Sequence, residues 1–157
     1  MPTTTKKYTV TWVTSQNDNK KSLTFDVYDG ETLRTAALRR NIVSPHNGRA
    51  NLINCRGLGT CGTCAIEILS GNVDPPQRNT AENLRLIFPP HNAANNHKKR
   101  LACQIQIRGD IQVQKRTGFW GQDASTTKVA EPSAPQKYLG DLEYLWDNKS
   151  PPEETKS

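Results

Sequence analysis

Two segments near the start of the chain, residues 8–13 and 22–28, alternate between apolar and polar side chains with a period of two. This period is typical of β-strands that bury one face. The polar stretch 15–21 between the two segments predicts a hairpin loop. The apolar positions on the shared faces are Tyr8, Val10, Trp12, Leu23, Phe25 and Val27.

After Gly30 the spacing of apolar residues becomes helical. Residues 31–40 predict a short helix with an acidic first turn and a basic last turn, which suits the helix macrodipole. A second helix is predicted over residues 80–88, because Asn79 and Glu82 have the spacing of a capping box. The first helix is expected to cover the sheet with Leu33, Ala36 and Ala37.

Further strand segments follow with the same alternation. Residues 65–69 predict a third strand, and residues 100–107 and 111–115 flank a Gly-Asp turn that predicts a terminal hairpin or a bent strand. No apolar run approaches the roughly 20 residues needed to span a bilayer, and no apolar leader opens the chain. We therefore expect no membrane span, no export and a cytoplasmic location.

Four cysteines carry the clearest chemical signal. Three of them lie in one glycine-rich run with the spacing C-x5-C-x2-C, formed by Cys55, Cys61 and Cys64, and Cys103 follows far along the chain. Three thiolates on one irregular loop with a distant fourth suit a binuclear iron centre, in which each of two irons takes two sulfur ligands. We therefore expect these four cysteines to bind an iron–sulfur cluster that transfers electrons.

The glycines and threonines of this loop support the same interpretation. Gly57, Gly59 and Gly62 stand where a loop around a cluster needs backbone conformations barred to residues with a Cβ atom, and where backbone N–H groups approach sulfur. Thr60 and Thr63 add hydroxyl donors beside the predicted ligands. Such hydrogen bonds help to set the reduction potential, because they favour the negative charge that a cluster takes up.

Zinc, disulfides and unrelated free thiols each suit these cysteines less well. A structural zinc site usually presents two C-x2-C pairs, and only Cys61 and Cys64 form one here. Two disulfides are arithmetically possible, but nothing in the sequence indicates an oxidising compartment. Unrelated buried thiols would explain Cys103 alone but not three cysteines in ten residues.

The predicted order strand, strand, helix, cysteine loop, strand, helix, strand resembles the [2Fe–2S] ferredoxins of plant and cyanobacterial type. The strings that carry the resemblance are residues 59–71, with Gly-Thr-Cys-Gly-Thr-Cys at their start, and residues 100–104, with 109–113 behind them. The resemblance covers about residues 6–117. It implies an α+β, ubiquitin-like β-grasp fold, with a mixed sheet, two short helices and a cluster-binding loop.

The resemblance also implies a function and a division of the ligands. Cys55 and Cys61 would hold the iron nearer the surface, and Cys64 and Cys103 the inner iron. The protein would be a one-electron carrier rather than an enzyme, working between a reductase or photosystem and a redox enzyme. Because the plant-type loop is C-x4-C-x2-C, the five residues after Cys55 indicate a divergent member, with a spacing also found in ferredoxins that serve hydroxylases and cluster biogenesis. A plastid stroma is the alternative location.

Charge bears on the expected partners. Residues 1–118 carry 17 Lys and Arg against 8 Asp and Glu, a balance of +9. Arg56 lies inside the loop and residues 98–100 (Lys-Lys-Arg) lead into Cys103, so positive charge is expected around the cluster. We expect redox protein partners with an acidic docking surface, the alternative being that these residues form only a solvated face.

The remaining groups indicate no further chemistry. His46, His91 and His97 lie in polar loops and are expected on the surface rather than as ligands. The chain has no recognition helix, and its aromatic residues alternate as core positions, so nucleic-acid binding is not expected. Neither a nucleophile–base pair nor a phosphate loop indicates catalysis, and no small-molecule substrate is expected.

Composition divides the chain into three parts. Residues 1–118 are the predicted [2Fe–2S] domain, 119–137 a flexible linker, and 138–157 an amphipathic segment and tail. The segment is too short to be stable alone, so it is expected to dock on its own domain or to recruit a larger complex. In the second case the chain would be a structural or adaptor subunit. The segment's apolar residues at helical spacing are Tyr138, Leu139, Leu142, Leu145 and Trp146.

Overall fold

The computed structural model describes residues 6–16, 19–40, 43–46, 50, 53–87, 99–115, 142 and 144–147. A five-stranded mixed sheet forms the body, in the order β2-β1-β7-β3-β5, and β4 and β6 pair in a small second sheet. β1 and β7 run parallel, and the other neighbours in the large sheet run antiparallel. The strands are β1 (Lys7–Gln16), β2 (Asn19–Tyr28), β3 (Ala65–Ser70), β4 (Val73–Asp74), β5 (Lys99–Leu101), β6 (Gln106–Ile107) and β7 (Ile111–Gln114).

The first hairpin is longer than its hydrophobic pattern predicts. Both predicted strands are present, but the pairing continues outward until Gln16 lies opposite Asn19. The predicted loop over residues 15–21 is therefore wrong. Backbone hydrogen bonds continue the two-stranded ladder through polar residues, and an alternation of apolar side chains gives no sign of this. The predicted inner face is confirmed, since Val10, Trp12, Phe25 and Val27 are buried and Tyr8 and Leu23 pack against the core.

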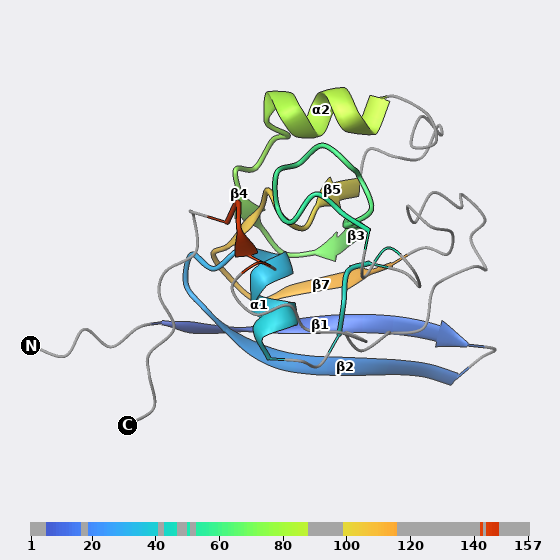
Figure 1. Ribbon diagram of the computed structural model, residues 1–157. Helices are drawn as coiled ribbons and strands as arrows, with labels where there is room; N and C mark the ends of the chain where they lie inside the picture. The colour runs from blue at the N-terminus through green and yellow to red at the C-terminus, as the bar shows by residue number, and fades with distance from the viewer. Residues whose placement is uncertain are drawn as a thin grey trace, which may run out of the picture.

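Helix α1 (Leu33–Arg39) lies against one face of the sheet (Figure 1). It begins two residues later than predicted, because Glu31 turns inward instead of entering the first turn. The buried Glu31 carboxylate accepts the backbone N–H of Tyr28 at 2.7 Å and a guanidinium N–H of Arg40 at 2.6 Å. The predicted apolar contacts of the helix are confirmed, since Leu33, Ala36 and Ala37 are fully buried.

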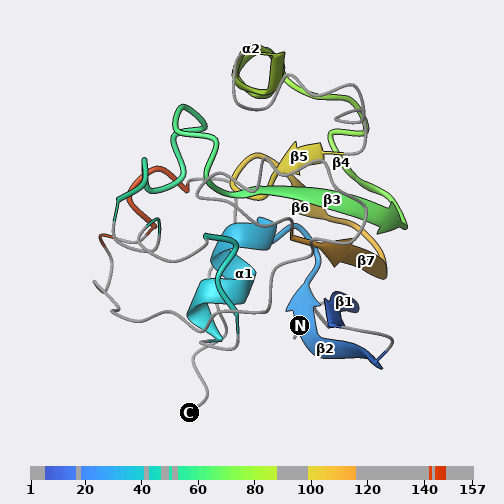
Figure 2. The ribbon, with the colours of Figure 1, turned by 90° about the vertical axis from the view of Figure 1, so that its right-hand side faces the viewer.

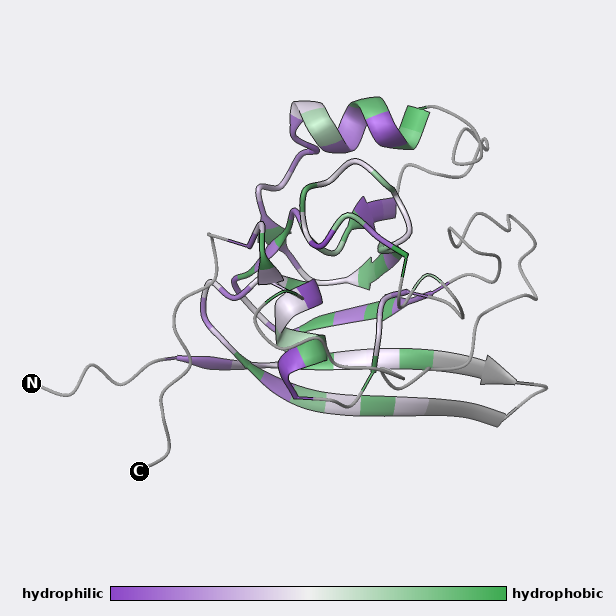
Figure 3. Ribbon diagram, in the orientation of Figure 1, coloured by the Kyte–Doolittle hydropathy of each residue, from purple (hydrophilic) through white to green (hydrophobic). Residues whose placement is uncertain are grey.

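Helix α2 (Thr80–Ile87) lies beside β5 (Figure 1) and begins with the predicted capping box. The Glu82 backbone N–H donates to Asn79 Oδ1 at 2.8 Å, and the Asn79 N–H donates to Glu82 Oε1 at 3.4 Å. The Glu82 carboxylate also accepts Arg100 Nε at 2.8 Å and Nη2 at 2.9 Å, in a buried bidentate pair. Figure 3 shows β5 largely in the hydrophilic colour, yet all three of its residues are buried, and the pairing with Glu82 balances the charge of Arg100.

Of the two forms predicted for residues 100–115, a terminal hairpin or a bent strand, the hairpin is wrong. β6 pairs with β4 in the small sheet, whereas β7 inserts between β1 and β3 in the large one. Alternation reveals that a segment is a strand but not which strand it joins, because that choice depends on contacts distant in sequence. Among the described residues, no helix is long and apolar enough to cross a membrane.

Candidate metal centre

The cysteine loop connects α1 to β3 and lies on the same side of the sheet as the helix (Figure 2). Cys55 and Cys61 lie on the loop itself and are half-buried. Cys64 and Cys103 are buried, Cys64 directly before β3 and Cys103 in the turn after β5. The sheet register places these two cysteines together, because Ala65 lies opposite Leu101.

The four thiols are free and meet in two pairs. Cys64 Sγ lies 3.5 Å from Cys103 Sγ. In the other pair, the thiols of Cys55 and Cys61 are hydrogen-bonded, and the backbone N–H of Cys55 donates to Cys61 Sγ at 3.4 Å. The pairs are neighbours, since the charge on Cys55 acts on Cys64.

Each pair contains one thiol that ionises readily. The hydrogen bond from Cys61, helped by backbone N–H groups of the loop, lowers the pKa of Cys55 to about 4. The hydrogen bond from Cys103 likewise lowers the pKa of Cys64. Donating these bonds raises the pKa values of Cys61 and Cys103. Thiolates are the form that binds metal, so Cys55 and Cys64 are the thiols closest to that form.

The donor set consists of four thiols that meet two by two. This arrangement suits a binuclear centre, in which two irons take two sulfur ligands each.

Glycine is required where the loop passes closest to its surroundings. Gly57, Gly59 and Gly62 have φ values of +98°, +88° and +73°, which confirms the predicted need for residues without a Cβ atom. A Cβ atom at Gly59 would lie 2.8 Å from Gln104 Nε2, and one at Gly62 would lie 2.7 Å from Arg85 Nε.

Gln104 connects three parts of the site, a role that the sequence did not reveal. Its Nε2 group donates to the Gly57 carbonyl at 3.1 Å and contacts Cys103 Sγ at 3.5 Å. Its Oε1 atom accepts Asn79 Nδ2 at 2.9 Å, at the start of α2. The side chain therefore ties the loop to the inner thiol pair, and its position next to Cys103 was the only signal in the sequence.

A buried polar chain reaches the outer thiol pair. Thr63 Oγ1 lies 3.2 Å from Cys61 Sγ and 2.8 Å from His46 Nδ1. Arg34 Nε donates to His46 Nε2 at 3.0 Å. The expectation that His46 lies on the surface is wrong, because this side chain is 2% exposed and hydrogen-bonded at both ring nitrogens. Thr60, the other predicted hydroxyl donor, is exposed.

A buried lysine lies beside the inner end of the loop. Lys115 Nζ donates to the carbonyls of Thr63 and Ala65, both at 2.7 Å, on either side of Cys64. Burial lowers the pKa of Lys115 to about 7, although the Cys64 thiolate opposes this shift. No pattern in the sequence indicates this contact, because a strand-end lysine is normally exposed.

The positive charge expected around the cluster is withdrawn from the surface at two positions. Lys99 and Arg100 are buried, and Arg100 is neutralised by Glu82. Arg56 is half-buried, and Lys98 lies outside the described residues. Large apolar side chains are exposed near the loop instead, with Ile53 66% exposed.

Residues 144–147, here called the C-terminal segment, dock on the cysteine loop and α1 of their own domain (Figure 2). The Trp146 N–H donates to the Arg56 carbonyl at 3.2 Å. The Asp147 carboxylate accepts the hydroxyls of Thr32, at 2.5 Å, and of Thr35. Of the two docking alternatives, the structure therefore has the one within the chain.

The predicted apolar face of this segment is wrong in detail. Leu145 and Trp146 are exposed, as is Leu142, whereas Tyr144 is buried beneath the Arg39 guanidinium, 4.7 Å from its ring centroid. Polar contacts, rather than an amphipathic helix, hold the segment. Tyr138, Leu139 and the predicted linker lie outside the described residues.

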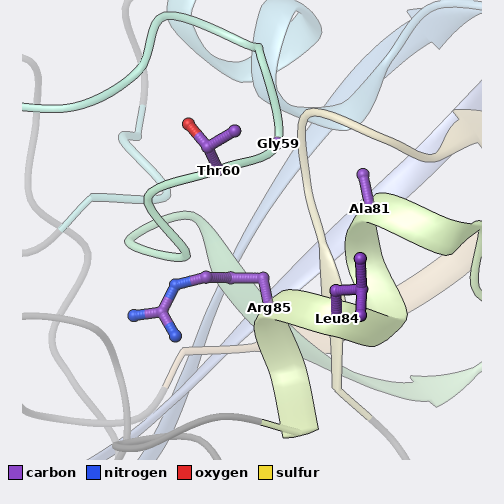
Figure 4. A pocket seen from close by; sticks show the side chains of 5 residues that line it. All are labelled: Gly59, Thr60, Ala81, Leu84 and Arg85. Atoms are coloured by element: carbon purple, nitrogen blue, oxygen red, sulfur yellow. The ribbon is translucent and has the colours of Figure 1, made fainter.

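A notch of about 310 Å³ separates the loop from α2 (Figure 4). Gly59 and Thr60 line it on the loop side, and Ala81, Leu84 and Arg85 line it on the helix side. The Arg85 side chain extends along the notch toward the loop (Figure 4).

Comparison with known proteins gives three kinds of similarity. Residues 16–108, more than half of the chain, match the family described as the 2Fe-2S iron-sulfur cluster binding domain. The chain is 36% identical over 78 residues to the photosynthetic NDH subunit of subcomplex B 3, chloroplastic, of Arabidopsis thaliana. The aligned region covers 50% of this chain and 35% of that protein. The chain thus spans about a third of the length of this curated relative.

Two solved structures are similar at low sequence identity. The ISC-like [2Fe-2S] ferredoxin of Pseudomonas putida has a TM-score of 0.49 and 17% identity, covering 81% of this chain and 99% of that one. A ferredoxin of Rhodopseudomonas palustris has a TM-score of 0.45 and 22% identity, covering 67% of this chain and 92% of that one.

Proposed function

The chain belongs to the 2Fe-2S iron–sulfur cluster binding domain family, and from this premise we propose that it carries single electrons with Cys55, Cys61, Cys64 and Cys103 as its cluster ligands. Membership confirms the predicted [2Fe–2S] cofactor, the ferredoxin-type β-grasp fold and a role in electron transfer. When bound, the cluster accepts and releases one electron at a time.

The pairing of the four thiols is the observation that carries the ligand assignment. The buried pair, Cys64 and Cys103, is proposed to hold the inner iron, and the half-buried pair, Cys55 and Cys61, the outer iron. Gly57, Gly59 and Gly62 are proposed to let the loop close around the cluster; their positive φ values support this role. The half-buried pair lies nearer to solvent, which supports electron exchange through the loop.

Electron paramagnetic resonance tests this function, together with the visible spectrum and the iron and zinc content. The purified protein should be silent when oxidised and should show a spin-half signal after dithionite reduction. Colourless protein that contains zinc would contradict the proposal. Colourless protein without metal would be reconstituted anaerobically with iron and sulfide, and failure to take up iron would equally contradict it.

We propose that the protein accepts electrons from a reductase or photosystem and passes them to a redox enzyme. The +9 balance of residues 1–118 supports an acidic partner surface, although Lys99 and Arg100 are buried and contribute nothing to docking. Apolar side chains near the loop, among them Ile53 and Leu58, are exposed. They support a partner interface whose central part is apolar. Partner affinity should fall as ionic strength rises, and insensitivity to salt would exclude electrostatic steering.

The second candidate function is that of a ferredoxin-like adaptor subunit in a larger assembly. The name of the Arabidopsis relative, an NDH subunit called chloroplastic, supports this candidate and also a plastid location. An adaptor should copurify in a fixed ratio with other chains, whereas a carrier should turn over with a reductase while free in solution. Cell fractionation tests whether the location is the plastid stroma or the cytoplasm.

We propose the division predicted from composition, with a cluster domain over residues 1–118, a linker over 119–137 and a tail over 138–157. The family match over residues 16–108 falls inside the first part, which supports the boundary. Limited proteolysis should cut first within 119–137 and leave the cluster bound. Equal protection of all three parts would contradict the division.

A further inference from the structure

The outer thiol pair is contacted by a chain of buried polar groups that begins on α1. Arg34 is 1% exposed, His46 2% and Thr63 1%, so all three side chains are shielded from water. The contacts run from Arg34 Nε to His46 Nε2 at 3.0 Å, from His46 Nδ1 to Thr63 Oγ1 at 2.8 Å, and from Thr63 Oγ1 to Cys61 Sγ at 3.2 Å. Three links therefore connect a guanidinium to a predicted ligand sulfur.

The direction of each hydrogen bond follows from the chemistry of the donors. A guanidinium can only donate, so His46 Nε2 must be the acceptor from Arg34. The His46 ring is neutral, because burial and then the charge of Arg34 hold its pKa well below the usual value. The single ring proton then resides on Nδ1 and is donated to Thr63 Oγ1.

The last link is fixed by the same reasoning. Because Thr63 Oγ1 accepts from His46, its own proton is free to point to Cys61 Sγ. A cysteine that ligates iron is a thiolate and has no proton to donate. All three donors therefore point in one direction, from the Arg34 charge toward the sulfur, and each bond polarises the next.

We propose that Arg34 and His46 are positioning residues that hold the Thr63 hydroxyl as a hydrogen-bond donor to Cys61 Sγ, and so raise the reduction potential of the cluster. This inference rests on the proposed function, because it takes Cys61 as a ligand. A donor at sulfur stabilises the negative charge gained on reduction. Without His46, the hydroxyl could rotate to other acceptors and the donor would be lost for part of the time.

Matched variants of the full chain separate this role from simple packing. Thr63→Val removes the hydroxyl at nearly constant volume, whereas Thr63→Ser keeps it. His46→Gln keeps an acceptor for Arg34 but lacks the donor at the Nδ1 position, whereas His46→Asn keeps that donor and gives up the Arg34 contact. Iron content and visible absorbance are measured first, and the midpoint potential is then measured by titration with redox dyes.

The midpoint potential of Thr63→Val should be more negative than that of the wild type, by up to about 59 mV. For a one-electron couple this shift equals a change of up to about tenfold in the ratio of oxidised to reduced protein at a fixed potential. Thr63→Ser should stay near the wild type. His46→Gln should shift in the same direction by a smaller amount, and His46→Asn less than His46→Gln. Pulsed paramagnetic resonance of the reduced wild type should show a deuterium-exchangeable proton coupled to the cluster, which Thr63→Val should lack.

Some results would overturn the inference alone, and one would overturn its premise as well. Fully loaded Thr63→Val or His46→Gln protein with the wild-type potential overturns the inference alone. If Thr63→Val fails to hold the cluster, the inference is tested by the potentials of the two His46 variants and by the exchangeable proton of the wild type. A wild-type potential in His46→Gln, or no such proton in the wild type, would then overturn it. If the wild type itself binds no iron after reconstitution, the proposed function fails and the inference fails with it.

Discussion

The two thiol pairs are held by different kinds of structure. The inner pair, Cys64 and Cys103, lies beside β3 and β5, whose register brings the two sulfurs together. Gln104 and Lys115 add contacts at this pair. The outer pair, Cys55 and Cys61, lies on an irregular loop and depends on contacts from distant parts of the chain. Strand pairing is the main determinant of the inner half of the site, whereas the outer half depends largely on side-chain contacts.

The supports of the outer pair come from several directions. Thr63 links Cys61 to the buried chain from α1, Gln104 holds the Gly57 carbonyl, and the C-terminal segment contacts the Arg56 carbonyl. A loop held by many separate contacts can change one of them without losing the others. The outer half is therefore where sequence changes can adjust the potential and the docking surface while the inner half stays constant.

The largest difference between the halves is expected on loss of a ligand. Cys103→Ser should abolish the normal cluster, because the turn directly after β5 holds position 103 and no neighbouring thiol can replace it. Cys55→Ser should retain a perturbed cluster at lower iron content, because the loop can move the serine oxygen toward iron. Iron per chain and the visible spectrum check both variants. A normal cluster in Cys103→Ser would mean that the fourth ligand is assigned wrongly.

The next largest effect should follow from breaking the ion pair that supports the inner half. Glu82→Gln leaves the buried Arg100 guanidinium without its charged partner, so the free energy of unfolding should fall by about 3 kcal/mol. Urea unfolding under anaerobic conditions measures this change. Asn83→Ala is the control, because Asn83 is exposed on the same helix. Equal losses in both variants would show that the pair is not a specific support.

A smaller effect is expected from loosening the C-terminal segment. Asp147→Ala removes the acceptor of the Thr32 and Thr35 hydroxyls and should lower the free energy of unfolding by about 1–3 kcal/mol. Iron release to a chelator should also accelerate, because the segment contacts the loop of the outer pair. Leu145→Ala, at an exposed position, is the control. An unchanged release rate would mean that the segment does not support the loop.

The smallest effect concerns the pH dependence of stability. The pKa of His46 is lowered in the folded protein, whereas the unfolded chain titrates near its usual pKa of about 6.5. Below about pH 6.5 the unfolded chain binds a proton that the folded one does not. As the pH is lowered further, the free energy of unfolding should therefore fall by at most about 1.4 kcal/mol per pH unit. His46→Asn should remove this part of the slope. Apparent Tm values between pH 5 and 7, at one scan rate, provide the test, and identical slopes would contradict it.

The thiols and glycines of the site were predictable from the sequence to a greater degree than the side chains that support them. Alternation identified the inner faces of β1 and β2, and cysteine spacing with the resemblance predicted the two pairs. The positive φ values at Gly57, Gly59 and Gly62 were also foreseeable, because a tight loop around sulfur excludes side chains at those points. These features depend on local rules that a sequence displays directly.

The buried polar side chains that support the thiols could not be predicted from the sequence in this way. His46 looks like a loop histidine until Arg34 and Thr63, 12 and 17 residues away, are placed on either side of its ring. Arg100 looks like a surface charge until Glu82 is placed against it from α2. Burial of a polar group depends on a partner that only the tertiary structure supplies.

The parallel pairing of β1 with β7 has a consequence for the order of biogenesis. Thr9 N–H donates to Asp110 Oδ1 across 101 residues, so the centre of the sheet joins the two ends of the domain. Contacts of such long range form slowly, because the loop-closure entropy must be overcome before they contribute. During synthesis, β1 therefore cannot pair with its second neighbour until β7 has left the ribosome. Cys103 comes shortly before β7 in the chain, so the fourth thiol and the strand that completes the sheet become available at nearly the same time.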